Sequence, residues 1–201
     1  LGDVYKRQDQ YDLNSKYLKG TDIKDLEDDK HLGRLKTTTS QSFVNKEGKF
    51  TVPVTFGGRS FSIRNAGNLG LVYDSGSDFE SITAKANKDT FNSHQEELGK
   101  IEFDSRSDDK GPEPESVITG VINGKTYAFI GLERTGGIMV YNVSNPKKPV
   151  FETYFKANDN GDISPEGLTF IDAKHSPTKQ PVLLASHEMS GTIAAYELTA
   201  L

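Results

Sequence analysis

Residues 114–141 read PESVITGVINGKTYAFIGLERTGGIMVY, and residues 165–196 read PEGLTFIDAKHSPTKQPVLLASHEMSGTIAAY. Both stretches begin with Pro-Glu, pass through apolar runs, and reach a second Glu just before a glycine-containing turn. Glu115 and Glu166 are 51 residues apart, and Glu133 and Glu188 are 55 apart. Blades of β-propellers recur at such a period. The sequence therefore predicts several copies of one β-sheet unit.

The strand signals around this repeat predict an all-β fold. Asn123-Gly124 separates two apolar runs and is a strong signal for a β-hairpin. Strands without intervening helices exclude a doubly wound α/β fold. We therefore expect a partial β-propeller of about three blades of antiparallel strands, with short helical insertions. Further strands are predicted at 33–40, 50–56 and 60–63 (these two as a hairpin), 71–73, 138–143, 150–155, 168–171, 182–185 and 193–198.

Two features lie upstream of the clear repeats. Ser77 and Glu80 have capping-box spacing, which predicts a helix that begins at Ser77 and ends near Asn87. Ile63 to Val72 and Tyr141 to Val150 each span nine residues and both enclose a turn. We interpret the first pair as a more diverged blade. The polar stretch at 88–114 is expected to be a long loop.

The length of 201 residues is too short for a closed propeller, which needs at least four blades of roughly 40 to 50 residues. Residues 1–8 resemble a translated adapter sequence, so we expect them to carry no functional information. We expect 9–32 to be a polar surface segment. Residues 33–201 then form the C-terminal part of a propeller domain, with the rest of the propeller upstream.

Composition excludes several classes of function. The chain has no cysteine, which excludes disulfides, thiol nucleophiles and cysteine-ligated metals. A net charge of −5 argues against a general nucleic-acid surface. No run of eighteen apolar residues predicts a membrane span in this chain.

The repeated acids are the best candidates for a site. If the repeats are blades, Glu115, Glu133, Glu166 and Glu188 converge on the propeller axis. Carboxylate oxygens of this kind suit Ca²⁺ or Mg²⁺, and we expect calcium. The alternative is that each acid only stabilises a turn by bonding a backbone N–H.

Other polar residues near these acids have two interpretations each. Asp108 and Asp109 could complete the cation site or belong to a solvated loop. Arg134 could bind a phosphate or form an ion pair with Glu133 or Glu115. His187, beside Glu188, could be a general base or metal ligand, but a lone histidine is more often structural. His187 and Arg134 are the catalytic candidates if the chain is an enzyme.

Several segments carry a resemblance to a known family. These are Gly57-Gly58-Arg59-Ser60-Phe61-Ser62-Ile63, the stretch from Asp74 to Glu80, the stretch from Asp104 to Glu115, Tyr127 to Tyr141, and Ser164-Pro165-Glu166-Gly167. The chain resembles the choice-of-anchor I family from about Leu26 to Leu198.

The resemblance implies a secreted or surface-attached bacterial β-propeller, related in pattern to an animal cell-surface glycoprotein. It implies an extracellular ligand or cell-surface component as partner. The competing interpretation is a metal-dependent phosphoester hydrolase, because members of the family are associated with phosphatase-like and phytase-like activities. In that case carboxylate-held metals would activate water.

Overall fold

A computed structural model describes residues 28–38, 44–52, 54–97, 99–156 and 161–199. The chain divides into two compact units, one of residues 1–57 with 107–110 and one of residues 58–106 with 111–201. The described residues are mostly β, with antiparallel sheets and one α-helix. The predicted adapter segment and residues 9–27 lie outside them.

Turns and ion pairs characterise the described part of the first unit. Residues 33–38 form a turn and irregular backbone, so the strand predicted at 33–40 is absent from the part that is described. Phe50 forms an isolated bridge with Val44. Among the described residues, the predicted hairpin between 50–56 and 60–63 is therefore not formed.

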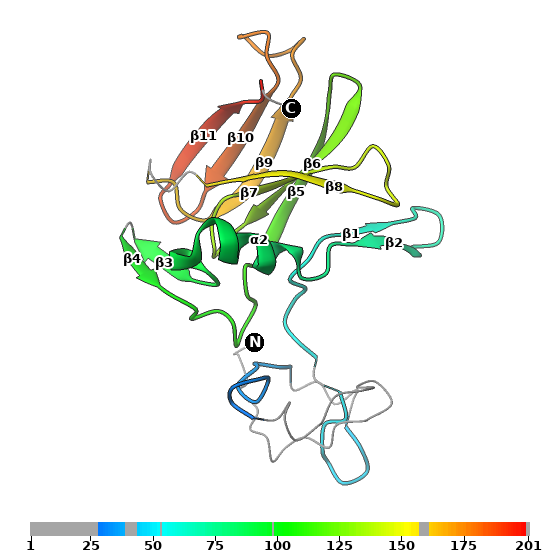
Figure 1. Cartoon of the computed structure of the whole chain (residues 1–201), viewed down its shortest axis with the longest axis vertical. Coiled ribbons are helices and arrows are strands. Elements are labelled where there is room, and N and C mark those ends of the chain that lie inside the picture. Colours follow the sequence, from blue (N-terminus) through cyan, green and yellow to red (C-terminus); the bar gives the residue numbers. More distant parts are fainter. Residues whose placement is uncertain (1–27, 39–43, 53, 98, 157–160, 200–201) are drawn as a thin grey trace. The chain divides into compact units, whose positions relative to one another are not determined.

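A four-stranded antiparallel sheet is the centre of the second unit (Figure 1). Its strands are β5 (Pro114–Ile122), β6 (Lys125–Leu132), β7 (Ile138–Asn142) and β8 (Val150–Phe155), paired in that order. Asn123 and Gly124 both have positive φ angles, of 51° and 78°, at the turn between β5 and β6. This geometry confirms the predicted hairpin.

A three-stranded sheet repeats the same arrangement. It consists of β9 (Pro165–Ile171), β10 (Val182–His187) and β11 (Thr192–Glu197), with β10 in the middle. Pro114 pairs with Leu132 in the first sheet, and Pro165 pairs with His187 in the second. Both sheets have a register shift beside this pair. The internal repeat predicted from the sequence is therefore present in the strand register.

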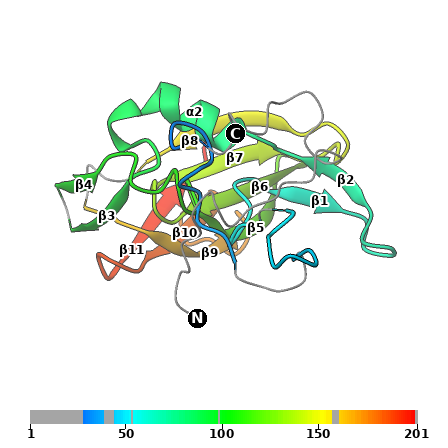
Figure 2. The ribbon, with the colours of Figure 1, turned by 90° about the horizontal axis from the view of Figure 1, so that it is seen from below.

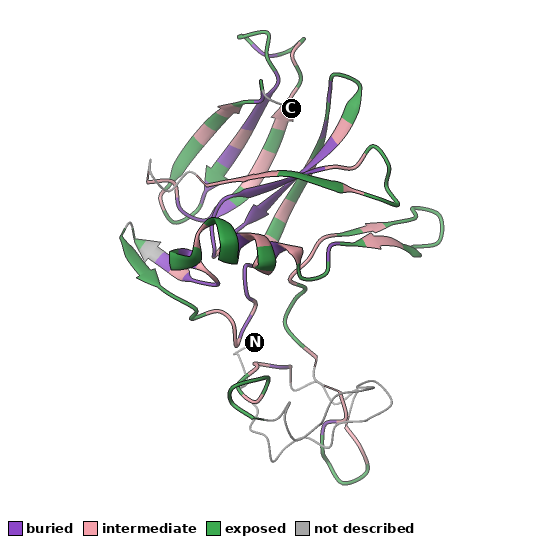
Figure 3. Ribbon diagram, in the orientation of Figure 1, coloured by how far each residue is buried: buried purple, intermediate pink, exposed green. Residues whose placement is uncertain are grey.

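The two sheets lie face to face (Figure 2). Aromatic and aliphatic side chains from both sheets form the core between them. The rings of Phe129 and Phe170 stack with centroids 6.0 Å apart. Gly120 makes this approach possible, because a Cβ there would lie 2.5 Å from the Phe170 ring. The buried members of this cluster are Ile122, Tyr127, Phe129, Ile138, Val140, Leu183, Ala185 and Leu198. Figure 3 shows that burial is concentrated in β6 and β7.

The opposite face of the four-stranded sheet is covered by α2 (Asp78–Ala86) and by residues near β1 (Ser62–Arg64). Phe79 of the helix is fully buried there and stacks on Phe61. The predicted helix bounds are confirmed, since the caps are Ser77 and Asn87. The capping-box hydrogen bond is absent, because the Ser77 side chain makes no cap bond.

Short elements fill the region predicted as a long loop. They are the 3₁₀ turn η3 (Lys88–Thr90) and the paired strands β3 (His94–Glu97) and β4 (Lys100–Glu102). Upstream, β1 pairs with β2 (Leu71–Asp74), and Ile63 faces Tyr73 just as Tyr141 faces Phe151 in β7 and β8. Paired residues of β1 and β2 are therefore separated along the chain by the same number of residues as those of β7 and β8. A ring of blades around an axis is not seen among the described residues.

Candidate acidic site

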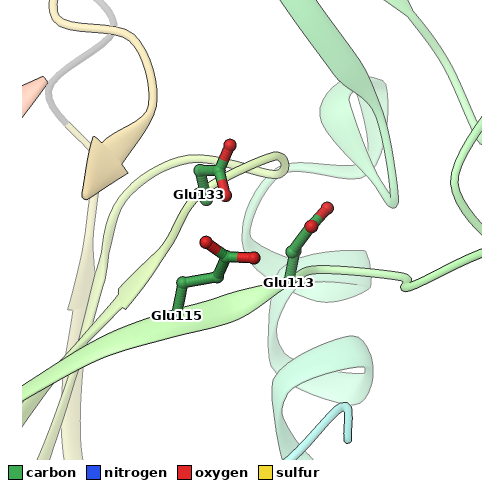
Figure 4. Close-up of side chains that lie close together, drawn as sticks. All are labelled: Glu113, Glu115 and Glu133. Carbon is green, nitrogen blue, oxygen red and sulfur yellow. The ribbon is translucent and has the colours of Figure 1, made fainter. Parts of the chain in front are cut away.

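Three glutamates converge at the end of the four-stranded sheet (Figure 4). Glu115 lies on β5, Glu113 immediately precedes this strand, and Glu133 follows β6. One carboxylate oxygen from each lies within 4.8 Å of the others. Glu113 and Glu133 are buried, whereas Glu115 is exposed. The cluster thus has a buried base and one side open to solvent.

The backbone brings the three residues together. The Glu133 N–H donates to the Glu113 carbonyl over 2.8 Å, which ties the entry of β5 to the exit of β6. Glu113 has a φ of 56°, a left-handed conformation that non-glycine residues rarely adopt. The register shift between Pro114 and Ser116 lies next to it. In this arrangement the carboxyl groups of Glu113 and Glu115 both lie beside that of Glu133.

The turn after β6 is held in place from β8. Tyr154 Oη donates to the Gly136 carbonyl over 2.7 Å, and Lys156 Nζ donates to the Thr135 carbonyl over 2.7 Å. Gly137 has a φ of 83°, and a Cβ there would lie 2.6 Å from the Tyr154 ring. Burial lowers the pKa of Lys156 to about 8. The turn that carries Glu133 is therefore fixed by several independent contacts.

Two arginines compensate part of the negative charge. Arg106 approaches Glu113 Oε2 at 2.8 Å, and Arg134 approaches the same oxygen at 3.5 Å. Arg134 also contacts Glu133 Oε1 at 2.8 Å. Among the described residues, the cluster thus joins three carboxyl groups with two guanidinium groups in one charge network.

The electrostatics of the cluster favour a proton on Glu133. Burial, together with a hydrogen bond to the Glu115 carboxyl group and the charges of Glu115 and Glu113, raises the pKa of Glu133 to about 7. Arg134 opposes this shift. Two carboxyl groups can hydrogen-bond to each other only when one is protonated. Below about pH 7 Glu133 therefore holds a proton, which a metal cation could replace.

The predicted acids divide into two groups. Glu115 and Glu133 meet in the cluster, whereas Glu166 and Glu188 are exposed at the equivalent positions of the second sheet. Glu113, which the sequence reasoning missed, is the third member. The repeat hid it, because the residue before the proline in the second copy is Ser164. The direct signal was the sequence Glu113-Pro114-Glu115.

The two aspartates and Arg134 differ in where they lie. Asp108 and Asp109 belong to the other compact unit, where they form ion pairs with Arg34 at 3.1 Å and Lys36 at 3.3 Å. Arg134 forms the ion pair with Glu133 that its second interpretation predicted, and it also pairs with Glu113, which was not predicted.

His187 is buried at the end of β10 in the second sheet. Burial lowers its pKa, although Asp162 and a hydrogen bond with the Ala185 backbone oppose the shift. This environment keeps the imidazole neutral near pH 7. The catalytic roles considered for His187 and Arg134 stay predictions.

These features define a domain of repeated antiparallel sheets with a cluster of acids at the end of one of them. The chain belongs to the choice-of-anchor I domain family, whose sequence profile matches residues 4–146. That match includes all three clustered glutamates. Among the described residues, no helix is long and apolar enough to cross a membrane.

Two characterised proteins are similar to the chain. Gigasin-3a of Magallana gigas is 29% identical over 196 residues, which cover 89% of this chain and 69% of that protein. The mesenchyme-specific cell surface glycoprotein of Strongylocentrotus purpuratus is 28% identical over 154 residues. That alignment covers 71% of this chain and 18% of the glycoprotein. No solved structure matches the chain.

Proposed function

We propose that this chain is part of a surface-exposed β-propeller domain that binds calcium through Glu113, Glu115 and Glu133 and presents a surface to an extracellular partner. The observation that carries the cation site is the convergence of three carboxyl groups, whose oxygens lie within 4.8 Å of one another. Glu113 precedes β5, Glu115 lies on β5, and Glu133 follows β6. Calcium takes carboxylate oxygens as ligands and tolerates irregular geometry. A site with one exposed acid and two buried acids suits such an ion.

The charge balance supports a cation of modest affinity. Arg106 and Arg134 already form ion pairs with the clustered acids, so the electrostatic attraction on a bound cation is weaker than in a site that contains acids alone. Calcium sites of extracellular modules have dissociation constants on the order of 10⁻⁴ to 10⁻³ M. We expect the affinity of this site to fall in that range. The proton on Glu133 leaves when the ion binds.

Two observations support the propeller and its location. The sheets β5–β8 and β9–β11 repeat one register and pack face to face, as successive blades do. One relative is by name a cell surface glycoprotein, which favours an extracellular or cell-surface location for this chain. The second observation agrees with the proposed partner, an extracellular component.

Binding is favoured over phosphoester hydrolysis by the state of the arginines. Arg134 is ion-paired to Glu113 and Glu133, and Arg106 is ion-paired to Glu113. A guanidinium group held by carboxylates is poorly placed to receive a phosphate as well. His187 lies in the second sheet and not in the acid cluster.

Calorimetric titration of the protein with CaCl₂ up to about 10 mM tests the site, a range that covers the expected affinity. Glu115→Gln and Glu133→Gln should each weaken calcium binding at least about tenfold, since each removes a charged ligand. The matched controls Glu166→Gln and Glu188→Gln, at the equivalent exposed positions, should leave it unchanged. Calcium binding that survives Glu115→Gln and Glu133→Gln together would refute the proposal.

A further inference from the structure

The acids of the second unit lie at one end of its two sheets. The clustered glutamates lie where β5 begins and β6 ends, and Glu166 lies where β9 begins. A Cβ on Gly131, near this end of the first sheet, would lie 3.0 Å from the Pro165 carbonyl. A Cβ on Gly120, farther along β5, would lie 2.5 Å from the Phe170 ring of β9. Both sheets therefore run in the same direction, and their other ends also lie together.

Three connections form the opposite end of this unit, which we call the basic end. They are residues 123–125, with Lys125 as the first residue of β6, residues 143–149 between β7 and β8, and residues 172–181 between β9 and β10. The first two are joined, since Thr126 N–H donates to Ser144 Oγ over 2.9 Å. The third is close to them, because Leu198 bonds the Pro181 carbonyl and shares a buried cluster with Ile122. Figure 1 shows 123–125 and 172–181 at the upper end of the sheets.

Exposed lysines dominate the basic end. They are Lys125, Lys147, Lys148, Lys174 and Lys179. Among the ion pairs of the described residues, none involves these ammonium groups. Asp172 is the one acid of the three segments, and His175 Nδ1 lies 2.7 Å from it; Glu197, at the end of β11, is a second acid nearby. A positive surface thus stands on a chain with a net charge of −5.

Hydrogen bonds hold the backbone of the two longer connections. Asn145 Oδ1 accepts a bond from Lys147 N–H over 3.1 Å, and the Asn145 carbonyl accepts one from Lys148 N–H over 3.0 Å. The Asp172 carbonyl accepts a bond from Ser176 N–H over 2.9 Å. Since the backbone is already ordered, a ligand has to order mainly the lysine side chains, which lowers the entropic cost of binding.

The side chains of the basic end define the chemistry of its ligand. Within these described segments there is no arginine, whose fork would suit a single phosphate. They contain no Phe, Tyr or Trp on which nucleic-acid bases could stack, and no exposed large apolar side chain that could enter a membrane. Asn, Ser, Thr and Gln side chains accompany the lysines and can bond sugar hydroxyl groups. This combination favours an acidic carbohydrate.

We propose that the basic end binds an acidic polysaccharide. Each lysine is a point charge on a flexible stem, so the set can pair with sulfate or carboxylate groups spaced along a polymer. The inference rests on the proposed function for its extracellular setting, and it gives the partner left open there a chemical class. It does not require the cation site, which lies at the other end of the sheets.

Binding to immobilised heparin, which is sulfated, and to polygalacturonate, which is carboxylated, tests the proposal in about 0.1 M NaCl with EDTA. The original chain should bind at least one polymer, and binding to heparin alone would assign sulfate as the recognised group. A loop variant combines Lys147→Gln, Lys148→Gln, Lys174→Gln and Lys179→Gln. Its affinity should fall at least about tenfold, because four modest ion pairs are lost together.

A matched control variant removes four exposed lysines outside the basic end. It combines Lys46→Gln, Lys49→Gln, Lys85→Gln and Lys88→Gln. Because it changes the net charge by the same amount, only a local surface can distinguish the two variants, and its affinity should change less than about twofold. An unchanged thermal midpoint shows that each variant is folded.

Three results would overturn the proposal. They are no binding of either polymer by the original chain, equal weakening by the two variants, and tighter binding to vesicles of phosphatidylserine and phosphatidylcholine than to either polymer. Calcium titration of the loop variant should match that of the original chain, because its substitutions lie away from the acids. Failure of the cation site and failure of the basic end are therefore separate observations.

Discussion

The pKa of Glu133 predicts how the stability of this domain depends on pH. The carboxyl group has a pKa near its ordinary value of 4.5 in the unfolded chain and about 7 in the folded protein. Between these values the folded state binds more protons than the unfolded state, so the free energy of unfolding falls as pH rises. The difference between the two pKa values, at about 1.36 kcal/mol per pH unit, sets an upper limit of about 3 kcal/mol on this loss of stability. Above about pH 7 the contribution is constant.

The substitution Glu133→Gln removes this titration and keeps the geometry. A glutamine amide can donate a hydrogen bond to Glu115 while its carbonyl accepts one from Arg134, as the protonated acid does. The variant should therefore match the original protein near about pH 4.5 and exceed its stability by about 1 to 3 kcal/mol at about pH 8. Urea denaturation at fixed ionic strength, without calcium, measures both values.

The comparison between the two proteins isolates Glu133. His187 has the opposite effect, because its lowered pKa makes stability rise with pH, but it is present in both proteins and cancels in the difference. The groups that face Glu133 are Glu113, Glu115 and Arg134, and they are also unchanged. Glu188→Gln is the matched exposed control. Parallel stability curves for the original protein and Glu133→Gln would contradict the reasoning.

Three further sets of substitutions test the packing. Ile138→Ala should lower the free energy of unfolding by about 2 to 4 kcal/mol, because it truncates a buried side chain. Ile193→Ala should lower it by less than about 1 kcal/mol, because Ile193 is exposed. Equal losses of the two variants in urea denaturation would contradict this difference in burial. Gly120→Ala should lower the free energy of unfolding by about 1 to 3 kcal/mol, because the added methyl group clashes with the Phe170 ring. The second substitution Phe170→Leu should restore part of that loss. Tyr154→Phe should lower the thermal midpoint, at a cost of about 1 kcal/mol, because it removes the hydrogen bond to the turn after β6; an unchanged midpoint would show that this bond is dispensable.

Local signals predicted the strands of the main sheets. Asn123-Gly124 defines the β5–β6 hairpin, and the repeat of Pro-Glu predicted the shared register of two sheets. Two strands begin slightly earlier than predicted: β9 begins at Pro165 and not at residue 168, and β11 begins at Thr192 and not at residue 193. The strands β3 and β4 were missed since their residues are mostly polar and carry no apolar alternation.

The site was half predictable. Glu115 and Glu133 followed from the repeat, but convergence of all four repeated acids would need both sheets to direct them to one point. The sheets share a backbone register and not a side-chain set: Ser164 replaces Glu113 and Met189 replaces Arg134 in the second sheet. Which acids gather depends on contacts between segments, such as Arg106 with Glu113, that periodicity does not reveal.

The residue before the first strand of each sheet has one further consequence. Glu113 and Ser164 both have positive φ, 56° and 62°, and the carbonyl of each accepts a hydrogen bond from the residue after the second strand. The left-handed conformation costs about 1 to 2 kcal/mol for a residue with a Cβ, whichever side chain follows. Since glutamate and serine both carry an unbranched Cβ, exchange of one for the other changes this cost little. Duplicated units can therefore diverge in chemistry at this position while the chain path stays the same, so that one copy becomes acidic and its neighbour neutral.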